Sequence, residues 1–174
     1  MISILSKNHN KTKRNYIERM LNDKVKCMIE AKKYGKNYWD GNRKFGYGGY
    51  KYIPGRWANV AKKIIKRYKL KSGSKVLDVG CGKGFLLYEM LKLQPGLIIH
   101  GFDISNYALK RVKKNRNLKV FKHKAEKKFP YKKKSFDLVI SLATLHNLKL
   151  FDLANSIEEI ERVGKKKIYN GRKF

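Results

Sequence analysis

The feature that most constrains the fold is a short apolar stretch that runs directly into closely spaced glycines. The run Val76-Leu77-Asp78-Val79 is typical of a buried strand, and glycines follow at alternate positions, Gly80, Gly82 and Gly84. In an open parallel sheet, ligands bind beyond the carboxyl ends of the strands, where glycines let the backbone approach them closely. The spacing G-x-G-x-G departs from the dinucleotide fingerprint G-x-G-x-x-G and from the phosphate-binding P-loop. The turn therefore predicts a ligand site of another kind.

Strand and helix patterns alternate from residue 72 onward. Strands are predicted over 74–80, 96–105, 118–123, 135–143 and 166–170, and helices over 82–92, 106–115 and 156–164, the last ended by Gly164. Such alternation requires crossover connections and a parallel sheet covered on both faces. The predicted fold class is therefore α/β, a doubly wound and mostly parallel sheet formed by residues 72–174.

Residues 1–71 have a different pattern and are predicted to form an N-terminal helical extension. An amphipathic helix is expected over 11–34, and a second one follows Pro54 and ends near Leu70. Between them, 36–57 combines glycines with many aromatic residues, and large rings favour an ordered segment over a linker. The side chains expected to close over a bound ligand are Tyr38, Trp39, Tyr47, Tyr50 and Arg56, although plain aromatic packing explains the rings almost as well.

The charge of the chain is strongly positive. Lysine and arginine number 43 against 13 acidic residues, which gives +30. A polyanion would be attracted to such a chain, so nonspecific nucleic-acid binding is expected at low salt. However, the excess is spread along the chain and lysine outnumbers arginine, which favours compositional drift over a dedicated nucleic-acid interface. The basic run from Lys122 to Lys134 is interpreted as a solvated crossover, with an RNA-contact loop as the alternative.

The cysteine count and the hydropathy pattern set the expected compartment. Cys27 and Cys81 form neither a disulfide framework nor a metal-binding spacing, so no metal is expected. No apolar run approaches the length of a membrane span. We expect a cytoplasmic protein without membrane association.

An acidic residue follows the second predicted strand. Asp103 comes 19 residues after Gly84, at a position where a carboxylate can accept hydrogen bonds from ribose hydroxyls. An isolated aspartate there would be interpreted as a helix cap, a role that Ser105 also fits. Together with the glycine turn, the ribose interpretation is favoured.

These motifs resemble the class I S-adenosylmethionine-dependent methyltransferases. VLDVGCGKG is similar to the first motif of that family, GFDIS to its acidic motif, and FPYKKKSFDLVISLATLHNL to its fourth-strand motif, in the family's order over roughly residues 72–168. The segment YWDGNRKFGYGGYKYIPGRW is also similar to the N-terminal motif of a less characterised subgroup. The resemblance implies the cofactor S-adenosylmethionine, a Rossmann-like sheet with strand order 3-2-1-4-5, and methyl transfer.

The resemblance also implies roles for individual residues. Asp78 and the three glycines would border the methionine and ribose parts of the cofactor, Asp103 would hold the ribose hydroxyls, and Ile104 would pack on adenine. Glu126 is the acidic candidate for the adenine amino group. Ser141 and Leu142 would face the sulfonium. His146 is the candidate general base for a hydroxyl or amine acceptor, with a solvated or capping histidine as the alternative.

The acceptor is expected to be a small molecule. The alternatives are an RNA or protein methyltransferase that uses the basic surface, and an inactive cofactor-binding remnant. No Asn-Pro-Pro-Tyr element is present. Its absence makes adenine N6 and glutamine less expected as the methylated groups. The sequence ends in or just after the fifth strand, and complete family members continue further, so we expect either a C-terminal truncation or a partner that covers the edge of that strand.

Overall fold

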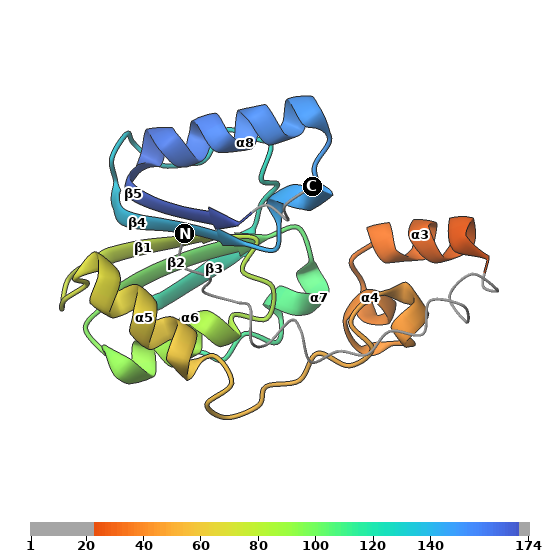
Figure 1. Ribbon diagram of the computed structural model, residues 1–174, viewed down its shortest axis with the longest axis horizontal. Coiled ribbons are helices and arrows are strands. Elements are labelled where there is room, and N and C mark those ends of the chain that lie inside the picture. The colour runs from red at the N-terminus through yellow and green to blue at the C-terminus, as the bar shows by residue number, and fades with distance from the viewer. Residues whose placement is uncertain (1–22, 171–174) are drawn as a thin grey trace. The chain divides into compact units, whose positions relative to one another are not determined.

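The computed structural model describes residues 23–170, which divide into two compact units at Pro54 and Gly55 (Figure 1). The helix predicted to follow Pro54 was expected to belong with residues 1–71. It lies after this division, in the same unit as the sheet. The sheet unit therefore begins before residue 72.

The first unit begins with helix α3, Lys24–Lys32. Asp23 caps it by accepting a hydrogen bond from Lys26 N at 3.0 Å. The predicted helix over 11–34 is confirmed for this part, and residues 11–22 lie outside the described residues. Its apolar side chains Val25, Met28 and Ile29 are each more than half exposed.

The glycine and aromatic segment is ordered and partly helical, with α4 at Lys36–Asp40 and a 3-10 turn at Arg43–Phe45. Tyr47 N donates to Tyr38 O at 2.8 Å, and Tyr50 N donates to Trp39 O at 2.9 Å. Trp39 is buried and stacks on Tyr47, with ring centroids 5.1 Å apart and planes 8° from parallel. These contacts explain why a segment without helical or strand periodicity has a fixed structure.

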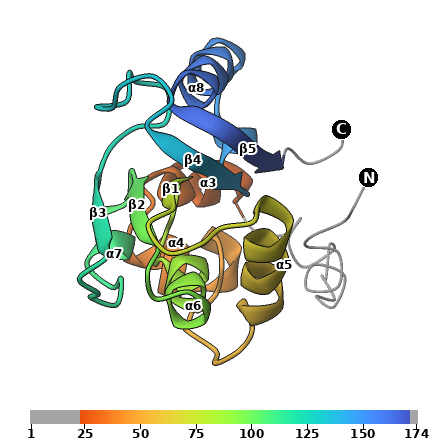
Figure 2. The ribbon, with the colours of Figure 1, turned by 90° about the vertical axis from the view of Figure 1, so that its left-hand side faces the viewer.

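The second unit contains a five-stranded sheet in which every neighbouring pair is parallel. The strands are β1 at Lys75–Val79, β2 at Ile98–Asp103, β3 at Leu118–Lys122, β4 at Phe136–Leu142 and β5 at Gly164–Asn170. Their order is β3-β2-β1-β4-β5 (Figure 2). The predicted fold class and strand order are confirmed.

Helices cover both faces of this sheet. Helices α5, Ala58–Tyr68, and α6, Phe85–Leu93, lie on one face, and α8, Leu150–Val163, lies on the other (Figure 1). Leu77 and Val79 belong to the core on the α8 side, together with Ile160 and Val163. Because side chains alternate along a strand, Asp78 points to the opposite face.

Two helices differ in length from the sequence prediction. Helix α7 covers only Asn106–Leu109, whereas a helix was predicted over 106–115. The lysines that follow, Lys110, Lys113 and Lys114, would be neighbours on a longer helix, and like charges at such spacing are unfavourable. Helix α8 begins at Leu150, six residues before the predicted start, without a side-chain cap on its first turn.

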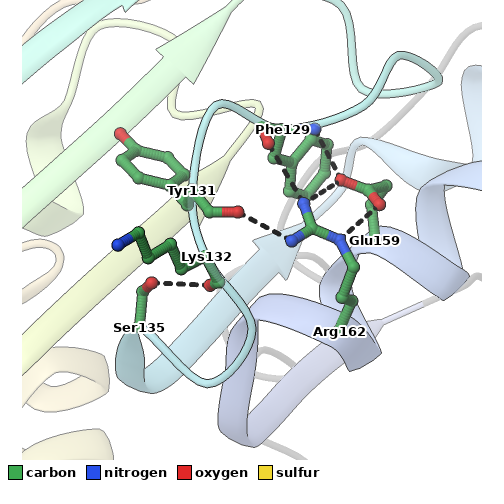
Figure 3. A network of polar contacts seen from close by, with 6 residues as sticks. All are labelled: Phe129, Tyr131, Lys132, Ser135, Glu159 and Arg162. Atoms are coloured by element: carbon green, nitrogen blue, oxygen red, sulfur yellow. Dashed lines mark hydrogen bonds and ion pairs between the residues drawn. The ribbon is translucent and has the colours of Figure 1, made fainter.

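An arginine on α8 fixes the segment that leads into β4 (Figure 3). Arg162 donates hydrogen bonds to Tyr131 O at 2.7 Å and to Phe129 O at 3.1 Å, and it pairs with both carboxylate oxygens of Glu159 at 2.6 Å. Glu159 also accepts from Phe129 N at 2.5 Å. We call these four residues the Arg162 clamp. It holds the chain before β4 against α8 and so positions the fourth strand.

Candidate functional site

The glycine turn is built at the carboxyl end of β1. Gly80, Gly82 and Gly84 all have positive φ, at 79°, 55° and 67°, a region that glycine adopts without steric cost. Gly80 N donates to Phe102 O at 2.9 Å, which joins the turn to β2. A Cβ on Gly80 would overlap the side chain of Thr144. Glycine is therefore required there both by the backbone conformation and by the close approach of the β4 end.

Asp103 ends β2 beside this turn. One carboxylate oxygen accepts from Gly82 N and the other from Ser105 N, each at 2.8 Å. Ser105 in turn caps α7 by accepting from Ala108 N at 3.1 Å. Asp103 is 8% exposed, and its carboxylate keeps lone-pair capacity beyond these backbone hydrogen bonds. It is therefore a fixed acceptor at the carboxyl edge of the sheet.

Asp78 lies next to Asp103 and differs from it in ionisation. Burial, with a smaller contribution from the charge of Asp103, raises the pKa of Asp78 to about 7. Burial also raises the pKa of Asp103, against the lowering effect of its backbone hydrogen bonds. Both carboxyls therefore hold their protons to a higher pH than an exposed aspartate does, and Asp78 titrates near neutral pH.

The end of β4 closes the site on the side away from β2. Ser141 is fully buried, and its hydroxyl donates to Val79 O at 3.1 Å. Thr144 Oγ1 lies 3.3 Å from Gly80 O. Ala143, which precedes Thr144 in the chain, has a positive φ of 57°. Leu142 is half-buried at the strand end. These contacts bind the ends of β1 and β4 together.

The other predicted residues of the sheet unit lie around this centre. Ile104 follows Asp103 and is 40% exposed. Glu126 lies in the connection from β3 to β4, with its carboxylate 3.7 Å from Lys124 Nζ. His146 is exposed on a 3-10 turn, Leu145–Asn147, just beyond β4. Arg56 is exposed before α5.

Four of the predicted pocket-closing residues gather in one ring cluster of the first unit, namely Tyr38, Trp39, Tyr47 and Tyr50. Arg56 lies in the other unit. Their role toward a ligand stays a prediction.

Two residues of the site were not assigned to it from the sequence. Ser105 was recognised only as a helix cap, and its backbone bond to Asp103 follows from the strand-to-helix turn that the cap creates. Thr144 had no signal in the sequence, because its contact with Gly80 joins residues 64 apart.

Cys81 was interpreted as a packing residue. Burial and the nearby carboxylates raise the pKa of its thiol well above the usual value. A nucleophilic cysteine requires a lowered pKa, so this shift agrees with a packing role.

The residues at this edge fit the cofactor that the sequence resemblance implies. A nucleoside with a cationic amino-acid chain requires hydroxyl acceptors, negative charge and open backbone. Asp103, Asp78 and the positive-φ glycines supply these three properties in one place. Among residues 23–170, no cluster of three or more His, Cys, Asp or Glu could hold a metal ion.

Comparison with protein families identifies the family of this chain. The family model described as a methyltransferase domain matches residues 70–169, which include β1 to β4 in full and β5 except for its last residue. The chain belongs to this methyltransferase family.

Relatives of this methyltransferase chain are named for different activities. It is 29% identical to a ubiquinone biosynthesis O-methyltransferase of Pelagibacter ubique, over 77% of this chain and 58% of the relative. It is 35% identical to the ribosomal RNA small subunit methyltransferase C of Buchnera aphidicola, over 59% of this chain and 30% of the relative. A SAM-dependent methyltransferase structure from Aquifex aeolicus aligns with a TM-score of 0.54 and 27% identity, over 66% of this chain and 63% of that one.

The methyltransferase chain is shorter than these proteins, and it matches between about a third and three fifths of their lengths.

Within residues 23–170, none of its helices has the length and apolar character needed to cross a bilayer.

Proposed function

We propose that the chain binds S-adenosylmethionine at the carboxyl edge of β1, β2 and β4 and transfers its methyl group. The observation that carries this proposal is the arrangement of Asp103, whose carboxylate is fixed by Gly82 N and Ser105 N beside three glycines of positive φ. A carboxylate fixed in this way is suited to accept hydrogen bonds from a ribose diol. The family match supports the same cofactor.

The residues of the chain would then act mainly by positioning. When bound, the cofactor supplies an activated methyl carbon. Asp103 orients the ribose, and the glycine turn lets the backbone approach the methionine part. In-line displacement gains much of its rate from such alignment. Ile104 is proposed to pack on adenine, Glu126 to accept from the adenine amino group, and Ser141 and Leu142 to line the methyl-donor side.

The cofactor proposal is tested by calorimetric titration with S-adenosylhomocysteine. Asp103→Asn removes the charge and one acceptor, so binding should weaken by at least about tenfold, which corresponds to about 1.4 kcal/mol. Asp137→Asn is the matched control, because Asp137 lies at the amino end of β4, where its carboxylate accepts from Lys75 N at the start of β1, and it should leave binding unchanged. Absence of binding to the unmodified chain would overturn the proposal.

For the acceptor we propose a small molecule with a hydroxyl or amine. The relative named for ubiquinone biosynthesis supports this class, because it aligns with more of this chain than the ribosomal RNA enzyme does. His146, exposed beyond β4, is the proposed general base. Removal of a general base typically costs 10²–10⁴-fold in rate, so His146→Ala should lower kcat by about that factor and leave S-adenosylhomocysteine binding unchanged.

RNA is the second acceptor candidate. The observation that favours it is the segment 104–125, which contains eight lysines and arginines and no acidic residue. Incubation with methyl-labelled cofactor and a cell extract, followed by separation of small molecules, RNA and protein, distinguishes the candidates. Label in the small-molecule fraction supports the first acceptor, and label in RNA supports the second.

A further inference from the structure

The connection from α7 to β3 borders an open hollow of about 590 Å³. The hollow lies where the predicted helix over 106–115 ends early, so that residues 110–117 run outside any helix or strand. Its volume is within the range of ligand pockets, roughly 300–1,000 Å³. It lies apart from the acidic pair, because neither Asp78 nor Asp103 lines it.

The lining of this hollow combines apolar and cationic side chains. Its half-buried apolar members are Leu109, Val112, Leu118 and Val120. Its exposed cations include Lys110, Lys114 and Arg116, none of which forms an ion pair with another residue of the described range 23–170. We call these three residues the cationic rim. An unneutralised rim around apolar surface suits a ligand that carries both negative charge and flat apolar groups.

From this combination we propose that the hollow binds single-stranded RNA, with phosphates on the cationic rim and bases against the apolar lining. Single-stranded nucleic acids are held by a positive groove along the backbone and by side chains on which the bases stack, among them arginine. The guanidinium plane of Arg116 can serve as such a platform beside the apolar lining. A bilayer surface would require protruding apolar side chains, whereas here they are recessed. Asn115 also lines the hollow. Its amide oxygen accepts from Asn117 N at 2.9 Å, and its amide nitrogen is suited to donate to the 2′-hydroxyl that distinguishes RNA from DNA.

The hollow adjoins the glycine turn. A Cβ on Gly84 would lie 3.0 Å from Val112 Cγ1, so Val112 contacts the turn and lines the hollow at the same time. RNA bound here would pass beside the proposed cofactor site. The inference concerns binding alone, and it holds whether the methylated acceptor is RNA or a small molecule.

The test is fluorescence anisotropy with a labelled oligouridylate over a series of salt concentrations. The triple variant Lys110→Gln, Lys114→Gln and Arg116→Gln should weaken binding by about tenfold or more. Each phosphate contact to a single strand contributes about 0.7 to the slope of log binding constant against log salt, so the slope should fall by about 2. Should the triple variant unfold in a thermal melt, Lys114→Glu alone carries the same test.

A matched control separates the hollow from the general charge of the chain. Lys127→Gln, Lys132→Gln and Lys133→Gln remove the same charge from exposed positions in the basic run before β4, and should weaken binding less than about threefold. Equal losses in both triple variants would overturn the proposal and leave nonspecific attraction to a chain of +30.

Two further ligands test the choice of RNA. DNA of matching sequence should bind more weakly than RNA, and inorganic polyphosphate should compete poorly per charge because it has no bases to place on the apolar lining. DNA binding equal to RNA, or equally effective competition by polyphosphate, would overturn the RNA assignment. None of these measurements requires cofactor, so failure here would leave the methyltransferase proposal standing, and failure to bind S-adenosylhomocysteine would leave this inference standing.

Discussion

Gly80 is held by two separate constraints, a positive φ of 79° and the side chain of Thr144. Gly73 has nearly the same φ, 80°, but a Cβ there would meet no atom within 4 Å. The two positions therefore allow backbone strain to be separated from steric overlap at the candidate site.

We predict that Gly73→Ala lowers the free energy of unfolding by about 1–2 kcal/mol, the usual cost of left-handed backbone. Gly80→Ala should lower the free energy of unfolding by about 1–3 kcal/mol more than Gly73→Ala does, because overpacking adds to the same strain. It should also weaken S-adenosylhomocysteine binding. Urea denaturation and calorimetry measure the two effects. Equal stability losses in the two variants would show that Thr144 yields without cost.

Asp78 predicts a pH dependence of stability. Its pKa rises from 3.8 to about 7 on folding, so between these values the folded state binds more protons than the unfolded state. The contribution of Asp78 to stability is therefore greatest at low pH and decreases until about pH 7. Asp78→Asn should remove this decrease, so the variant should gain in stability relative to the unmodified chain as pH rises from about 4 to 7. Urea denaturation over that range checks the difference, and parallel curves would contradict it.

At the site, the sequence predicted the residues whose role depends on neighbours close in the chain. The glycines and the strand-end acid Asp103 are of this kind, and the structure places them together. Thr144 could not be found, because its contact with Gly80 depends on how β4 lies beside β1. The roles of Glu126 and His146 toward ligands stay predictions.

Among the elements, the Arg162 clamp connects α8 with the chain before β4. Arg162→Ala should lower the free energy of unfolding by about 1–2 kcal/mol, because the charge-assisted bonds are partly exposed to solvent. Amide hydrogen exchange should increase at residues 127–135 more than elsewhere. Arg162→Lys should recover little of the stability that Arg162→Ala loses, since an ammonium group lacks the planar fork that reaches both carbonyls. Full recovery with lysine would contradict the role given to the fork.

The strands were predictable because buried parallel strands are short apolar runs bounded by turn residues, as in β1 and β4. Helix ends were less predictable. The helix predicted over 106–115 ends at Leu109, a difference that arises because the prediction did not weigh the lysines that follow. The early start of α8 places Leu150 and Phe151 in its first turn, where they are 77% and 84% exposed, so neither capping nor burial signalled that end.

At the scale of the whole molecule, the charge of +30 predicts a response to salt. Like charges repel more in the compact state than in the extended chain, and salt screens that repulsion over roughly 10 Å at 0.1 M. Added sodium chloride should therefore raise the melting temperature measured by calorimetry. An unchanged or lower melting temperature would show that the ion pairs, such as Arg162 with Glu159, outweigh the repulsion.

The position of β1 in the centre of the sheet has a consequence for biosynthesis. Val76 is paired on one side with Ile99 and on the other with Leu138, 62 residues later in the chain. At ribosomal speeds of about 5–20 residues per second, β4 emerges roughly 3–12 seconds after β1. During that interval the nascent chain can pair β1, β2 and β3 but leaves one edge of its central strand open. A chaperone that shields extended apolar segments would find its principal target there, and its release would be timed by the synthesis of β4.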